Sequence, residues 1–211
     1  MLLNLLKPDT RIAYYRSGQA FPVKGLLGKF IGTGINLRKA GLIEFGQLVL
    51  PESTSRDLAT LALQYGDFLN YWVIADLLGT LQKFAVEDEK LRAQLGLSLD
   101  TEKLDHLARH LSQESCFFGY LDGCGDYAAL VGRVRERILT YRKYINMNLK
   151  DGLPDSVKTT VSVIGEPISR LSGALKDVGI LDRDTEVYVR VDQYEQLATL
   201  NTGESSFGDF C

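Results

Sequence analysis

The spacing of apolar residues predicts three long helices in the middle of the chain. The first begins near Thr54, where Thr54-x-x-Asp57 can form a capping box, and its apolar positions recur at intervals of three, four and five as far as Leu81. The same periodicity predicts a second helix at residues 101–112 and a third at residues 127–149. The residues expected to face a common core are Leu58, Leu61, Tyr65, Phe68, Trp72, Leu77, Leu81, Leu104, Leu107, Ala108, Leu111, Tyr127, Val131, Val134, Ile138, Tyr141 and Ile145. Helices with one apolar face are expected to pack as a bundle.

Segments with strand-like composition flank this bundle. Residues 11–16 (RIAYYR) combine Ile with paired Tyr, residues 159–164 (TTVSVI) are strand-like or at least extended, and residues 186–191 (EVYVRV) carry the alternation of a strand. A helix at residues 166–178, with Pro167 at its start and Gly179 at its end, separates the last two segments. Strands on both sides of a helical insertion predict an α/β fold.

The N-terminal segments are less regular. We interpret residues 1–7 (MLLNLLK) as the end of a helix that is stopped by Pro8 and that begins before the chain does. Seven glycines predict an irregular loop over residues 18–46, followed by a short strand near residues 48–50.

These elements divide the chain into the N-terminal part of an α/β core at residues 1–51, a helical insertion at residues 52–150 and the C-terminal part of the core at residues 151–211. Composition agrees with a globular domain, since 45% of the residues are apolar and 24% are charged. A net charge of −3 argues against a nucleic-acid coat or a polybasic membrane surface. The three cysteines form no C-x-x-C pair, and the apolar start is too short for a membrane span or a signal peptide. We therefore expect a cytoplasmic protein without a membrane partner.

One strand ends in a residue type that carries chemistry. The segment VYVRVDQYEQL places Asp192 directly after a strand, at the sheet edge where α/β folds keep their ligands. In P-loop ATPases such an aspartate holds magnesium, usually through water, and a glutamate that polarises the attacking water often follows. Here Gln193 follows, and an amide can orient water but cannot take its proton. An ordinary strand that ends in an acidic turn explains the same residues.

Three other patterns favour structural interpretations. The segment GLLGKFIGTG, residues 25–34, lacks the spacing of a phosphate loop and has Phe30 where a hydroxyl should bind magnesium. His106 and His110 share a helical face but have no third ligand or catalytic glutamate, so zinc is not expected. The third helix carries a basic side formed by Arg133, Arg135, Arg137, Arg142 and Lys143. Such a side is usually solvated, although it leaves nucleic-acid contact open.

The order of several segments resembles that of bacterial and archaeal AAA-type ATPases related to the origin-recognition ATPases. The segments that carry the resemblance are MLLNLL, IAYYR, FLNYWVIADLLGTL, ILTYRKYIN and DQYEQL, in that order. The last corresponds to D-E-Y-E-N-L in the family, with two changes in six residues. The resemblance extends from Met1 to Asn201, and it implies an α/β fold that is part of a P-loop NTPase core with an α-helical insertion.

The resemblance also implies roles for three residues. Asp192 falls on the family's magnesium aspartate, which makes ATP and Mg²⁺ the expected cofactors. Gln193 falls on the position of the catalytic glutamate, which puts hydrolysis in doubt, and Glu195 is a second candidate for the base. The family's phosphate loop would stand immediately before Met1, and its sensor residue, arginine finger and lid domain would follow the chain.

The chain is thus expected to be a fragment of an ATP-binding, ATP-hydrolysing protein that is inactive by itself. Its expected partners are other parts of the same ATPase or a homo-oligomer, together with a protein that docks on the helical insertion. Two alternatives remain: a non-enzymatic helical interaction module, and a degenerate gene remnant.

Overall fold

The computed structural model describes residue 5 and residues 7–23, 26–46, 55–146, 152–193, 201–202 and 205–206. Its longer helices are α1 (Pro8–Ser17), α4 (Ser55–Ala85), α6 (Thr101–Ser112), α7 (Tyr127–Asn146) and α9 (Glu166–Asp177). Its shorter helices are α2 (Leu37–Ala40), α3 (Leu42–Gly46), α5 (Glu89–Gln94), α8 (Asp155–Lys158) and the 3₁₀ turn η3 (Ser115–Phe117). Its strands are β1 (Phe30–Asn36), β2 (Glu186–Asp192), β3 (Asn201–Thr202) and β4 (Ser205–Ser206).

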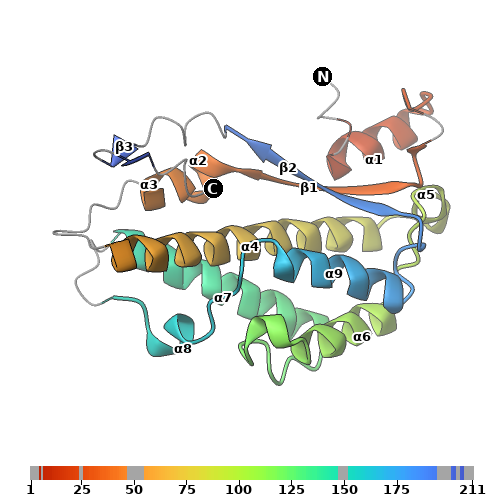
Figure 1. Ribbon diagram of the computed structural model, residues 1–211. Helices are drawn as coiled ribbons and strands as arrows, with labels where there is room; N and C mark the ends of the chain where they lie inside the picture. Colours follow the sequence, from red (N-terminus) through yellow and green to blue (C-terminus); the bar gives the residue numbers. More distant parts are fainter. Residues whose placement is uncertain are drawn as a thin grey trace.

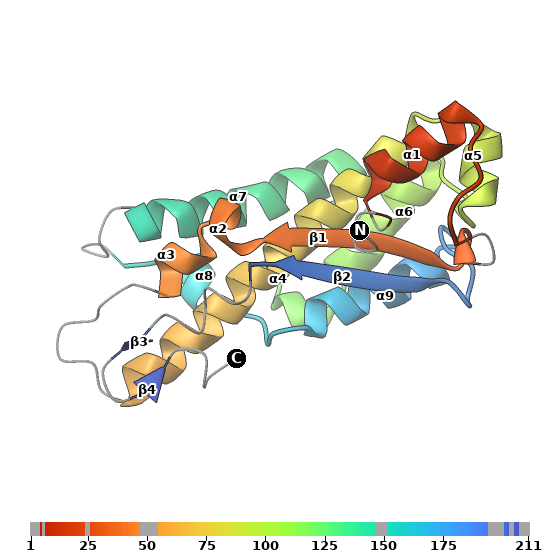
Figure 2. The ribbon, with the colours of Figure 1, turned by 90° about the horizontal axis from the view of Figure 1, so that it is seen from above.

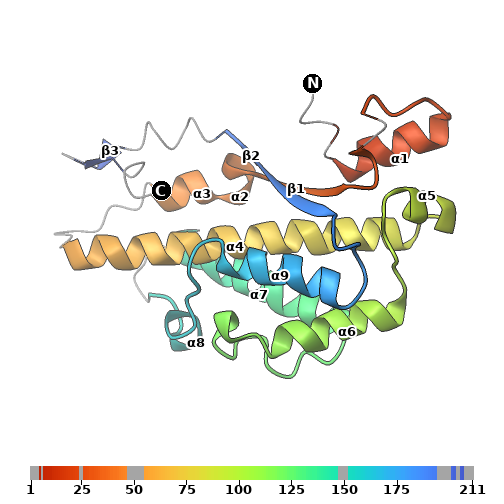
Figure 3. The same ribbon diagram turned by 45° about the vertical axis from the view of Figure 1, so that its right-hand side comes forward.

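The helix α4 runs between the sheet and the remaining helices. The strands β1 and β2 lie along one side of it, and α6, α7 and α9 lie along the other (Figures 1 and 3). Both sides of α4 are therefore buried: Phe68 and Leu77 have no exposed surface. The rings of Phe45, Phe68 and Tyr141 pack against one another, and the ring centroids of Phe68 and Tyr141 are 5.0 Å apart. This aromatic packing joins α3, α4 and α7.

Two strands from opposite ends of the chain form the sheet. β1 pairs with β2 in parallel, from Phe30 opposite Glu186 to Asn36 opposite Asp192 (Figure 2). Ile31, Thr33 and Ile35 are buried toward α4, because alternate side chains of a strand point to the same face. The whole helical layer is thus inserted between two neighbouring strands.

The predicted helical elements are confirmed. Helices α4, α6, α7 and α9 cover the predicted segments, and α6 begins after Asp100, whose side chain accepts a hydrogen bond from the Lys103 N–H. The inward positions from Leu61 to Ile145 are buried, except that Trp72 and Val131 are half-buried, and the side chain of Leu58 lies outside the described part of the chain. The predicted strand before Asp192 is also confirmed as β2. The capping box at Thr54, the strand near residues 48–50 and residues 1–4 of the predicted N-terminal helix end lie outside the described residues. The prediction that Pro8 stops a helix is wrong, because Lys7 is extended and Pro8 begins α1.

Two further N-terminal predictions are wrong. Residues 11–16 form part of helix α1 and not a strand. Pro8 begins this helix, because its fixed φ and missing N–H are tolerated in the first turn. Gly18 caps the other end in the left-handed conformation, with φ 67°. Residues 18–46 are not an irregular loop, because they contain β1, α2 and α3. The glycines of β1 favour a loop by composition, but Gly34 is needed in the strand because the side chain of Arg190 lies against it.

The segment 159–164 is not a strand. It leaves α8 through a turn at residues 159–160 and continues as an irregular connection, in which the Ser162 N–H donates to the Asp67 carboxylate. A side chain thus takes the place of a strand partner. The described chain is therefore mostly helical with a small parallel sheet, which agrees with the α/β class in its general form. No helix among the described residues is long and apolar enough to cross a membrane.

Candidate functional site at the carboxyl end of the sheet

Asp192 occupies the end of β2, as the sequence predicts. It stands opposite Asn36, the last residue of β1, so both polar residues lie at the carboxyl edge of the parallel pair. The Asn36 side chain is already used, because its Oδ1 accepts a hydrogen bond of 3.0 Å from the Lys39 N–H and caps α2. The Asp192 side chain remains 36% exposed. Asp192 is therefore the only charged acceptor of the two, and its carboxylate is the stronger candidate for a ligand.

The closest charge to Asp192 is Arg190. Its Nη2 lies 3.6 Å from Asp192 Oδ2, and the two side chains point to the same face of β2 because they are two residues apart. The Arg190 side chain is 13% exposed and lies against Gly34 of the neighbouring strand. Arg190 partly neutralises the carboxylate without covering it.

Gln193 has a backbone conformation that is unusual for its type. Its φ is 67°, in the left-handed region that costs a residue with a Cβ roughly 1–2 kcal/mol. Its Oε1 is buried and has no hydrogen-bond partner among the described residues. Strain and an unpaired buried acceptor at one residue are typical of functional sites. Glu195, the second candidate base, lies outside the described residues.

The carboxyl end of the sheet fits magnesium in only one respect. Magnesium keeps several waters and is usually held by one or two carboxylates together with substrate phosphates. Asp192 supplies one exposed carboxylate, and the described residues contain no group of three His, Cys, Asp or Glu side chains that could hold a metal by themselves. The metal would therefore need the phosphates of a nucleotide, and no phosphate loop occurs in the sequence.

The other sequence candidates have ordinary surroundings. Residues 30–34 of the glycine-rich segment belong to β1 and not to a strand-to-helix turn. His106 and His110 lie on α6, where His110 Nδ1 is 3.7 Å from Glu114 Oε1. A zinc site is not formed by these or the other described residues.

The basic side of α7 is exposed at four of its five predicted positions, and two of these four have partners within the protein. Arg137 points into the core and is fully buried, which corrects its assignment to this side. The guanidinium of Arg142 stacks 5.2 Å from the Trp72 ring and donates to the Lys39 carbonyl. Arg133 pairs with Glu136 at 3.3 Å. Arg135 and Lys143 remain exposed, so this side of α7 keeps part of its positive charge at the surface.

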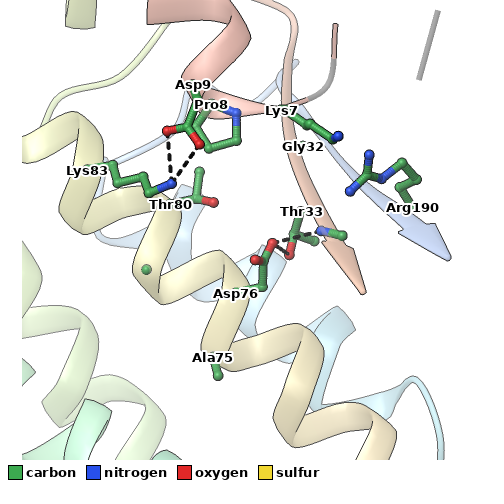
Figure 4. A pocket seen from close by; sticks show the side chains of 12 residues that line it. Lys7, Pro8, Asp9, Gly32, Thr33, Ala75, Asp76, Thr80, Lys83 and Arg190 are labelled. Atoms are coloured by element: carbon green, nitrogen blue, oxygen red, sulfur yellow. Dashed lines mark hydrogen bonds and ion pairs between the residues drawn. The ribbon is translucent and has the colours of Figure 1, made fainter. Parts of the chain in front are cut away.

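Sequence reasoning missed a pocket beside the outer edge of β1 (Figure 4). It has a volume of about 280 Å³. The lining residues are Lys7, Pro8, Asp9, Gly32, Thr33, Gly34, Ala75, Asp76, Gly79, Thr80, Lys83 and Arg190. They come from four elements that are distant in the sequence, so no local motif signals them. The only sign of the pocket in the hydrophobic pattern is Arg190, which interrupts the apolar run of β2.

Comparison with known proteins adds no relative: no family model, no curated protein and no solved structure matches this chain.

Proposed function

We propose that this chain forms part of the nucleotide-binding core of an AAA-type ATPase, with β2 as the magnesium strand. The observation that carries the proposal is the position of Asp192, exposed at the carboxyl end of a parallel strand whose outer edge is unpaired among the described residues. The resemblance of DQYEQL to the family's metal motif supports the same role for Asp192.

The sheet has one protected edge and one open edge. At the outer edge of β1, the Arg11 guanidinium donates to the Phe30 carbonyl at 3.0 Å, and Asp76 Oδ2 accepts from the Gly34 N–H at 2.7 Å. Side chains thus block further strand pairing on this side. Burial lowers the pKa of Arg11 to about 10, so its guanidinium still carries its charge at neutral pH when it donates to the Phe30 carbonyl.

The outer edge of β2 is open instead. The Glu186 N–H donates to the Lys29 carbonyl at 2.9 Å, so the even-numbered residues of β2 direct their backbone groups to β1. Val187, Val189 and Val191 direct theirs away from it, and the Val189 and Val191 side chains are each 39% exposed. Parallel sheets are normally larger and covered on both faces. Other strands of the same ATPase are the partner that this edge favours.

The chemistry follows from the two residues at the end of β2. Asp192 would hold magnesium through water, and a bound magnesium ion would neutralise the charge of the transferring phosphate. Gln193 would orient the attacking water through its amide, without removing its proton. An ATPase of this kind works in the cytoplasm, where Cys116 and Cys124, both free in the structure, remain thiols.

The proposal is tested with the native protein, purified from its source cells with and without the change Asp192→Asn. We expect magnesium-dependent ATP turnover to fall about 100-fold, in the range seen when residues that orient a metal's ligands are removed. Asp184→Asn is the matched control, because Asp184 is exposed, pairs with Lys29 and lies at the opposite end of β2. Native protein without ATP turnover, or an Asp192→Asn variant with full turnover, contradicts the proposal.

The 211 residues alone should bind magnesium-ATP weakly, because no G-x-x-x-x-G-K-[ST] sequence is present to hold the phosphates. Binding by these residues at micromolar ATP would contradict this expectation.

The open edge of β2 also favours a second candidate, a non-enzymatic module that binds a partner by strand addition. The two candidates differ in their dependence on Asp192. A module should capture the same partner with Asp192→Asn as with the unchanged chain, whereas an ATPase should lose its turnover.

A further inference from the structure

The pocket beside β1 presents two positive charges to one space. Lys7, at the N-cap of α1, and Arg190, from β2, point toward each other from opposite sides (Figure 4). Lys7 forms no ion pair with a described residue, and Arg190 has only its 3.6 Å contact with Asp192. Neighbouring like charges repel each other, and an anion between them would remove that repulsion.

A helix terminus adds to the positive character of the pocket. Pro8 and Asp9 of α1 line it, so the positive end of the helix dipole lies at the pocket wall. The third cation of the pocket, Lys83, is already paired with Asp9 at 2.9 Å. Lys83 therefore adds no free charge, whereas Lys7 has no ion-pair partner among the described residues and Arg190 has only the 3.6 Å contact with Asp192.

The opposite wall carries an oriented acceptor. Asp76 of α4 accepts hydrogen bonds at Oδ2 from the Thr33 hydroxyl, at 2.8 Å, and from the Gly34 N–H, at 2.7 Å. Both bonds use the same oxygen, so the carboxylate is fixed in orientation, and Oδ1 accepts no hydrogen bond from the part of the chain that the structure describes. The hydroxyl of Thr80 lines the same wall. A fixed carboxylate with a free oxygen is suited to accept hydrogen bonds from ligand hydroxyls.

We propose that this pocket binds a small phosphomonoester that carries hydroxyl groups, such as a sugar phosphate. The phosphate lies between Lys7 and Arg190, and a ligand hydroxyl donates to Asp76. A phosphate monoester carries a charge of about −1.5 to −2 at neutral pH, which matches two cations better than a single carboxylate does. The volume of about 280 Å³ lies near the lower limit of small-molecule sites. The pocket adjoins the ATP site proposed at Asp192, because Arg190 lines the pocket and lies 3.6 Å from Asp192. Asp76, which binds the Gly34 N–H, lies instead at the edge of β1 that faces away from β2.

Gly34 offers a variant that removes the anion contact and keeps every charge. A Cβ at this position would lie 2.7 Å from Arg190 Nη2 and 2.9 Å from its Nε. Its φ lies outside the left-handed region, so Gly34→Ala is compatible with the backbone. The substitution should therefore move the flexible guanidinium and leave the strand intact.

The test is calorimetric titration of the 211-residue chain with ribose 5-phosphate, with ribose and inorganic phosphate as reference ligands. We expect saturable binding of ribose 5-phosphate, weaker binding of phosphate and none of ribose. Lys7→Gln and Gly34→Ala should each weaken ribose 5-phosphate binding at least about tenfold, since each removes a hydrogen bond to a charged group. Asp76→Asn should weaken binding of ribose 5-phosphate but not of phosphate.

Arg183→Gln is the matched control, because Arg183 is an exposed cation outside the pocket. Circular dichroism of each variant verifies that the fold is retained. Absence of saturable ribose 5-phosphate binding overturns the proposal. It is also overturned if Arg183→Gln weakens binding as much as Lys7→Gln does, because binding would then reflect net charge alone. An Asp76→Asn variant that binds ribose 5-phosphate normally overturns the hydroxyl contact.

Discussion

Arg137 and Asp67 form an ion pair in which both side chains are completely buried, with 2.7 Å between Nη2 and Oδ2. Asp67 also accepts hydrogen bonds from the Tyr141 hydroxyl, at 2.8 Å, and from the Ser162 N–H, at 2.8 Å. Arg137 donates further to the Thr160 carbonyl at 2.8 Å. Burial by itself lowers the pKa of Arg137, but Asp67 together with Tyr141 and Tyr71 outweighs burial and raises that pKa above its ordinary value. The pair joins α4, α7 and the segment that leads to α9.

Breaking this pair should destabilise the protein strongly. Arg137→Met leaves the Asp67 carboxylate buried without its partner, and we expect a loss of about 3–5 kcal/mol in the free energy of unfolding. Urea denaturation followed by circular dichroism measures the loss. The double variant Asp67→Asn/Arg137→Met should cost clearly less than the sum of the two single changes. Additive costs would show that the two side chains are not coupled.

The amide at the end of β2 should limit hydrolysis. In the native protein, Gln193→Glu places a carboxylate where the attacking water is expected, and general bases contribute about 10²–10⁴-fold to rate. We expect ATP turnover to rise at least about tenfold. Gln193→Ala is the control, because it removes the amide without adding a base. Equal ATP turnover of the Gln193→Glu and Gln193→Ala variants would show that residue 193 does not act on the attacking water.

The open edge of β2 should make the isolated chain associate with itself. Val189→Pro removes an N–H that points away from β1, so it should prevent edge-to-edge pairing while β1 and β2 stay paired. Sedimentation velocity over a range of concentrations should show association of the unchanged chain and a monomeric Val189→Pro variant. Val189→Thr keeps the N–H and should associate normally. A chain that stays monomeric at every concentration contradicts the assignment of a free edge.

Stability should decline in alkaline solution. Burial, and after it the charges of Glu166 and Glu114, raise the pKa of the Cys116 thiol from 9.0 to about 11. Between these values the folded chain holds a proton that the unfolded chain has released, so the free energy of unfolding falls as the pH rises. Burial also raises the pKa of Tyr141 and Tyr71, which extends the decline above pH 10.

Urea denaturation between pH 8 and pH 11 measures this decline, and Cys116→Ala should reduce its slope between pH 9 and pH 11. A free energy of unfolding that stays constant or rises over this range would contradict the cause assigned to the thiol.

The helical layer could be predicted because its signal is local. Apolar residues recur along α4 and α7 with the helical period, and that period alone identifies the buried face. Of the two strands of the parallel sheet, only β2 could be predicted. The apolar alternation of β2 is visible in the sequence. The glycines of β1 hide a strand, and Gly34 is explained only by Arg190, far along the chain.

The sites show the same division. Asp192 is visible because the strand that positions it immediately precedes it. The pair of Asp67 and Arg137 is not visible, because its two members are 70 residues apart and each resembles a surface charge on an amphipathic helix. The pocket residues Lys7, Asp76 and Arg190 also meet only in the folded chain.

The most direct measurement of the central claim is metal binding at the end of β2. Mn²⁺ replaces Mg²⁺ in the native protein with bound ATP, and water-proton relaxation reports the bound metal. We predict that Asp192→Asn lowers the affinity for Mn²⁺ at least about tenfold, and that Asp184→Asn leaves it unchanged. Equal affinities of the Asp192→Asn variant and the unchanged protein would show that this strand does not hold the metal.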